Sequence, residues 1–156
     1  MKHILSLKYL YLLIVAISLI VYGCSKVNSS NNASDEPIWN KVCTIWGCNS
    51  SDIIELMDRY KLYSIQPTTL CYKGFDNVEA ITYKFKKDSL YATVLLIKEE
   101  MTDIEEIRAS FNKYESLGEN DSYEIFISTA KNLFITLSST QKGDKKFHAI
   151  GYTTLK

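Results

Sequence analysis

The sequence predicts an α+β fold in which two α-β-β-β repeats form one antiparallel sheet, with both helices packed on one face. Two observations predict it. A stretch with helical spacing of apolar residues is followed by three stretches that alternate with a period of two. The same series then occurs a second time along the chain. One helix with three strands would bury little apolar surface, so we expect the two copies to join edge to edge.

The first predicted helix lies within residues 47–60. Asn49 can cap its first turn, and Asp52, three residues later, completes a capping box. The apolar residues that follow fall on one face of such a helix: Ile53, Leu56, Met57 and Tyr60. Three strands are then expected over residues 68–74, 79–85 and 90–97, the last two joined by a tight turn at Lys87 and Asp88.

The second copy begins with a predicted helix over residues 101–118. Thr102 stands at its N-cap, Glu105 stands at the capping-box position, and Gly118 ends it. Its apolar stripe consists of Ile104, Ile107, Phe111 and Tyr114. Three more strands are expected over residues 122–128, 132–139 and 146–155. Two copies leave one face of the sheet open.

The N-terminus has the layout of an export signal. Lys2 and Lys8 precede an uncharged segment, residues 9–22. This segment is shorter than the ~20 residues that a membrane-spanning helix needs. Val21-Tyr22-Gly23-Cys24 resembles the bacterial lipobox, so we expect Cys24 to be acylated with fatty acids such as palmitate and to become the first residue after cleavage. An uncleaved anchor or an ordinary secretory signal is the alternative.

The chain is therefore divided into a lipoprotein signal peptide (1–23), a flexible tether carrying the lipid (24–36) and a single duplicated α+β domain (37–156). The tether is rich in Ser and Asn and has no aromatic residue, so it cannot bury enough surface to order itself. These features predict a domain that lies outside the cytoplasm and is anchored by lipid to a membrane of the bacterial cell envelope, which we expect to be the outer membrane.

Composition argues against several functions. Removing the signal peptide takes away Lys2 and Lys8 and leaves acidic residues in slight excess, and Arg59 and Arg108 are the only arginines, so no nucleic-acid partner is expected. His148 is the only histidine after the signal. We find no catalytic or metal-binding motif, and we predict a protein that is not an enzyme and has no cofactor and no metal site.

Three cysteines remain besides Cys24, namely Cys43, Cys48 and Cys71. In an oxidising compartment any one of the three pairings could form a disulfide and leave one thiol over. The alternative is that Cys48, and Cys71 with it, are small buried apolar residues.

The stretch from Ile45 to Met57, with Trp46-Gly47 before a capped helix, resembles a group of small Bacteroidota lipoproteins whose domain is similar to the β-lactamase-inhibitor-protein fold. The later stretches "LCYKG" and "ITYKFKKDSLY" also carry the resemblance. It implies a duplicated helix-plus-sheet unit that acts as an interaction scaffold through its open sheet face. No inhibitory residue can be transferred to this chain.

Strand alternation predicts which side chains occupy that open face. The predicted partner-binding residues are Lys84, Tyr91, Phe126, Phe134, Thr136, His148 and Tyr152. Aromatic residues interleaved with Lys and Thr suit recognition of another envelope protein. The alternative function is binding of a glycan or peptide ligand on the same face. Alternatively, several of these side chains fill a second small core against Trp39 and Trp46.

Overall fold

The computed structural model describes residues 44–119, 123–128 and 132–154. The predicted signal peptide, Cys24, the tether and Cys43 lie outside the described residues. The elements in chain order are α2 (Ser50–Leu56), β1 (Leu62–Gln66), β2 (Thr69–Lys73), β3 (Val78–Lys86), β4 (Ser89–Lys98), the 3₁₀ helix η2 (Glu99–Met101), α3 (Ile104–Ser110), β5 (Glu115–Glu119), β6 (Tyr123–Ser128), β7 (Leu133–Lys142) and β8 (Lys145–Thr154).

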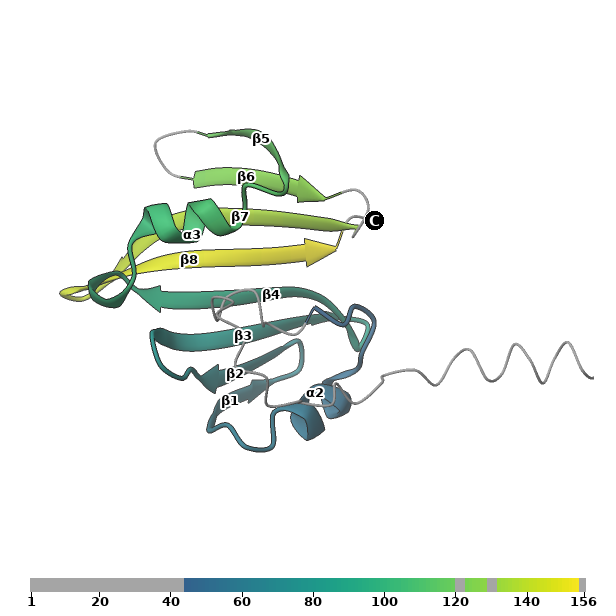
Figure 1. Cartoon of the computed structure of the whole chain (residues 1–156). Coiled ribbons are helices and arrows are strands. Elements are labelled where there is room, and N and C mark those ends of the chain that lie inside the picture. The colour runs from purple at the N-terminus through teal and green to yellow at the C-terminus, as the bar shows by residue number, and fades with distance from the viewer. Residues whose placement is uncertain (1–43, 120–122, 129–131, 155–156) are drawn as a thin grey trace, which may run out of the picture. The chain divides into compact units, whose positions relative to one another are not determined.

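The eight strands form one sheet in the order β1-β2-β3-β4-β8-β7-β6-β5, and every neighbouring pair is antiparallel (Figure 1). Each half is a four-stranded meander, and the two halves meet where β4 pairs with β8. Within the described residues the fold is therefore mostly β with two short α-helices, and the α+β prediction is confirmed only in its antiparallel sheet.

Two strands were not predicted. β1 and β5 form the two edges of the sheet, where nearly all of their side chains are exposed. Edge strands show no inward-outward alternation because solvent reaches both of their faces. For this reason the prediction of a helix that continues to residue 118 is wrong. The helix α3 ends at Ser110, β5 follows it, and each repeat has four strands instead of three.

From the helix cap to the bulge of the edge strand, the two halves match at a constant spacing. Asn49 and Asp103 cap the helices, and the buried Ile53 and Ile107 follow them; the members of each pair are 54 residues apart. The β1–β2 pairing has a bulge at Tyr63, and the β5–β6 pairing has one at Leu117, again 54 residues later. A shared bulge at a shared spacing is strong evidence that the two halves are copies of one unit.

The helix caps follow local chemistry. The Asn49 side chain accepts from the Asp52 N–H and the Asp52 carboxylate accepts from the Asn49 N–H, both at 2.9 Å, which confirms the predicted capping box. In the second copy the N-cap is Asp103, one residue after the predicted Thr102. The Thr102 hydroxyl instead accepts a 2.7 Å hydrogen bond from the Asn77 side chain, and this bond holds it in the interior.

The core lies between the helices and the sheet. Met57, just after α2, accepts a hydrogen bond from the Tyr83 hydroxyl at 3.3 Å from its sulfur. Phe111, just after α3, is fully buried, and its ring lies 5.4 Å from that of Phe126 and 6.4 Å from that of Tyr152. One continuous apolar cluster includes side chains of both repeats, so the two halves share a single core.

Candidate functional site: the second face of the sheet

Strand register divides the side chains between two faces, because residues paired across strands point to the same side. The face called here the core face has one row that crosses β2, β3, β4, β8, β7 and β6 in turn: Leu70, Tyr83, Thr93, Tyr152, Ile135 and Phe126. All six side chains are buried. Their neighbours one position along each strand form the second face.

Three residues predicted for partner binding lie on the core face, and that part of the prediction is wrong. Phe126 and Tyr152 pack against Phe111, and His148 is 4% exposed and pairs with Ile97 and Ser139. On β6 the second face has three large apolar residues, Tyr123, Ile125 and Ile127, whereas the core face has only Phe126. A count of apolar residues therefore predicts the wrong inward face for this strand. Contact with Phe111 sets the parity instead, because the rings of Phe126 and Tyr152 both pack against it on the core face.

Glu124 reinforces that register. It lies on the core face of β6, where the first repeat has Leu70, and its carboxylate accepts two 2.9 Å hydrogen bonds from Nε of Arg108. Arg108 also pairs with Glu105. The hydrogen bond to Glu124, followed by that to Glu105, raises the pKa of the Arg108 guanidinium. The cation therefore stays charged and ties α3 to β6.

The second face carries three of its predicted members. Lys84, Phe134 and Thr136 lie on it, and Tyr91 lies beside it at the bulge of β4 between Leu90 and Ala92. One row crosses all eight strands: Ser64, Cys71, Thr82, Val94, Gly151, Thr136, Ile125 and Gly118. The rows on either side contribute Ala80, Leu96, Ala149, Ser138 and Tyr123, and Lys84, Ala92, Thr153, Phe134 and Ile127.

This surface has a centre of small side chains and two unlike sides. On β4 and β8 the face carries mainly Ala, Val, Gly and Thr, whereas β6 and β7 add Ile125, Ile127 and Phe134. Most of these side chains are half-buried. A Cβ atom on Gly151 would lie 2.6 Å from the Thr136 Oγ1, so the threonine side chain occupies the space above the glycine. The face can make apolar contacts over a broad surface.

The described cysteines differ in state. Cys71 is a free thiol on the second face, 3.6 Å from the Thr82 hydroxyl, whereas Cys48 is buried and disulfide-bonded. A disulfide that includes Cys71 is therefore not formed. Pairing of Cys48 with Cys43 stays a prediction, because Cys43 lies outside the described residues.

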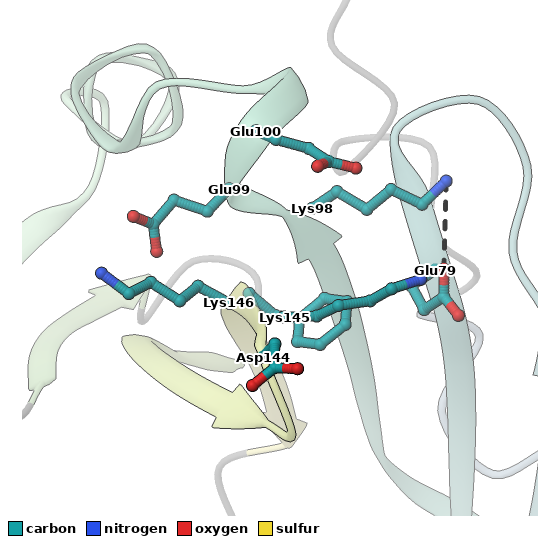
Figure 2. A pocket seen from close by; sticks show the side chains of 8 residues that line it. Glu79, Lys98, Glu99, Glu100, Asp144, Lys145 and Lys146 are labelled. Atoms are coloured by element: carbon teal, nitrogen blue, oxygen red, sulfur yellow. Dashed lines mark ion pairs between the residues drawn. The ribbon is translucent and has the colours of Figure 1, made fainter.

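Two shallow pockets lie near η2, at one end of β4 and β8. The first, of about 310 Å³, has a mixed lining in which the Lys98 ammonium lies 3.9 Å from the Glu79 carboxylate, and Lys145 and Lys146 extend across it toward the acidic residues (Figure 2). Asp144, Glu99 and Glu100 also line it. Opposite charges here largely balance one another, so the pocket has no marked preference for either sign of ligand.

The second pocket includes His148 and acidic residues of η2 and of the start of α3. Glu99, Glu100, Asp103 and Glu106 line it, and the His148 Nδ1 is 3.5 Å from the Ser139 hydroxyl. Within residues 44–119, 123–128 and 132–154, no group of three His, Cys, Asp or Glu side chains has the geometry to hold a metal ion.

Two buried tyrosines have perturbed hydroxyls. Burial raises the pKa of Tyr152, and the nearby Tyr114 raises it further. Burial also raises the pKa of Tyr72, whose hydroxyl is buried without a hydrogen-bond partner in the described part of the chain. Both phenols therefore stay neutral at physiological pH, and both belong to the core face.

Comparison with known protein families, with curated proteins and with solved structures found no match to this chain. In the part of the chain that the structure describes, no helix has the length and apolarity needed to span a bilayer. The resemblance to lipoproteins with a β-lactamase-inhibitor-protein-like fold stays a prediction.

Proposed function

We propose that this chain is a lipid-anchored protein of the bacterial cell envelope that acts as a non-enzymatic interaction module and binds a partner protein through the second face of its sheet. The observation that carries the proposal is the central row of the second face, which crosses all eight strands and is half-buried from Cys71 on β2 to Ile125 on β6. A surface that is apolar at its centre and continuous over a rigid sheet is suited to protein recognition.

The packing of the helices supports an accessible second face. Met57 contacts Tyr83, and Phe111 contacts Phe126 and Tyr152, and all three sheet residues belong to the core face. The residues that follow the two described α-helices thus pack on the core face, which supports a second face that these helices leave accessible.

The dimensions of the sheet are adequate for an interface. Seven interstrand spacings of about 4.8 Å make the sheet about 34 Å wide, and strands of ten residues extend about 30 Å. The flat area of one face is therefore on the order of 1,000 Å², against the ~800 Å² that each partner buries in a typical specific complex. Covering its apolar side chains would contribute about 25 cal/mol for each Å² removed from water.

A glycan or peptide ligand, the second function that the sequence suggests, fits these features less well. Such ligands favour a concave apolar site with a few converging polar groups. The two described pockets are shallow and are lined largely by charged side chains. We therefore favour a protein partner.

The interaction test is a pull-down from detergent-solubilised envelopes with the full-length protein. The double variant Val94→Lys, Ile125→Lys places two charges in the central row of the second face, on β4 and β6. Met101→Lys, at an exposed position in η2, is the matched control. We expect a specific partner to bind the native protein and the control but not the double variant, provided that all three have similar melting temperatures. Recovery of the same proteins with all three would refute the proposal.

The anchor needs a separate test. Cys24→Ser should abolish labelling by a fatty-acid probe and release the domain from membranes, because acyl chains are the proposed attachment. If the variant stays in the membrane without label, the N-terminal segment is an uncleaved anchor. If it is released and the native protein was never labelled, the segment is an ordinary secretory signal.

A further inference from the structure

The two edge strands of the sheet differ in charge, and the two repeats allow them to be compared residue by residue. β1 forms one edge and β5 the other (Figure 1). Equivalent positions in the helix and the edge strand of the two repeats are 54 residues apart. At three of these positions the first repeat has an apolar residue and the second repeat has a polar one. Ile54 corresponds to Arg108, Leu56 to Ser110 and Ile65 to Glu119.

The β5 edge has charged residues that discourage strand pairing. Glu115 and Glu119 stand at its two ends, and Arg108 beside it pairs with Glu105 and Glu124. Charged side chains on an edge strand oppose pairing with another chain, because they would lose water on contact. The β5 edge is therefore protected against association.

The β1 edge lacks this protection. The strand reads Leu-Tyr-Ser-Ile-Gln, without charge or proline, and its bulge at Tyr63 is shared by β5, so the bulge does not distinguish the two edges. Large apolar side chains on β1 and in and after α2 are exposed: Ile54, Leu56, Tyr60, Tyr63 and Ile65. Ile65 is 64% exposed although it pairs with the buried Leu70. A neutral edge with exposed apolar residues is the kind that adds a further strand.

We infer that two copies of this chain associate through β1, antiparallel about Ser64, so that their sheets join into one sheet of sixteen strands. This arrangement sets Tyr63 of each copy opposite Ile65 of the other, an aromatic and β-branched pair that favours sheet pairing. It also keeps the two Lys61 side chains apart. Six residues at about 3.3 Å separate them, or about 20 Å, whereas a parallel arrangement would place them side by side.

The exposed area agrees with a second copy as the occupant. Ile54 and Leu56 are two positions apart on α2 and point to different sides, so at most four of these side chains can face one partner. A large side chain can bury roughly 150–250 Å², so four that are 36–64% exposed offer on the order of 350 Å² per chain. A symmetric pair would cover about twice that from these residues alone, and the β1 backbone adds more. The total approaches the ~1,200 Å² at the lower limit of stable interfaces. This surface is separate from the second face, so neither proposal depends on the other.

The test uses the full-length chain in the envelope of a bacterial host, co-expressed with two different tags. A photo-crosslinking phenylalanine analogue replaces Tyr63 in one chain and, as the control, Leu117, its equivalent on β5. We expect position 63 to give a product of twice the chain mass that carries both tags, with at least tenfold the yield at position 117. Ile65→Glu, which copies the β5 edge, should lower that yield at least tenfold, and Leu117→Glu should leave it unchanged.

Ile65→Glu should also be as resistant to protease as the native chain, because Ile65 is mostly exposed. Where it is not, Ile65→Thr, a smaller change, replaces it in the comparison. A product from position 63 that contains another protein, equal yields at positions 63 and 117, a yield that the residue-65 variants do not change, or no product from position 63 would each overturn the inference.

Discussion

Phe126 and Phe134 provide the sharpest test of the division of the sheet into two faces. They lie on adjacent strands and differ in face: Phe126 pairs with Ile135 on the core face, and Phe134 pairs with Ile127 on the second face. Phe126 is 5% exposed and contacts the Phe111 ring. Replacing it with alanine removes buried carbon and leaves a cavity, at a cost of about 3–5 kcal/mol.

Phe134→Ala removes the same atoms from a half-buried position and should cost about 1 kcal/mol, because solvent can fill the space. A domain of this size has ~5–15 kcal/mol of stability, so the two variants should be easily resolved. Urea unfolding of both variants against the native protein gives the two free energies of unfolding. Equal losses, or a larger loss for Phe134→Ala, would mean that the register assigned to β6 and β7 is wrong.

Three further predictions follow from single contacts. Gly151→Ala should lower the free energy of unfolding by about 1 kcal/mol, because its Cβ would meet the Thr136 hydroxyl. Adding Thr136→Ala in the same chain should recover most of the lost stability in a thermal melt, and no recovery would refute the contact. The free energy of unfolding should be level near neutral pH and fall above pH 10. The reason is that Tyr152 ionises at its ordinary pKa in the unfolded chain, whereas burial raises its pKa in the folded chain. Tyr152→Phe should reduce this fall by up to about 1.4 kcal/mol per pH unit. Alkylation of the unreduced, unfolded protein should modify Cys71 and not Cys48, and mass spectrometry that finds Cys48 modified would contradict it.

The sequence was informative where local chemistry decides the structure. The capping box of Asn49 and Asp52 formed as predicted, because both hydrogen bonds are made within one turn. The turn at Lys87 and Asp88 also formed, with both residues at positive φ, the geometry of a tight two-residue hairpin turn. Both features depend on residues adjacent in the chain, so a sequence pattern contains nearly all the necessary information.

Features that depend on distant contacts could not be predicted in the same way. Phe126, His148 and Tyr152 alternate with other apolar residues, and only contact with Phe111 and the pairing of β7 with β8 decides which set points inward. Shifting a strand by one residue exchanges its two faces. The predicted partner-binding face contains the same error. Where alternation alone assigns a strand to the wrong face, all the side chains predicted for the open face on that strand lie on the core face instead.

The duplication explains why the two proposed surfaces can have different roles. Ile53 and Ile107, which follow the two helix caps, are both buried and apolar, because one shared core must be filled. Ile65 and Glu119 occupy equivalent edge positions that the core does not constrain, so they can diverge. A dimer formed through β1 would place two copies of the second face side by side on one rigid sheet. A partner with two matching sites would then bind the second face at a raised effective concentration, with an apparent affinity up to ~10²–10⁴-fold above that of one face. Ile65→Glu should therefore weaken the binding of a bivalent partner while leaving that of a monovalent partner unchanged, which separates self-association from partner recognition in one variant.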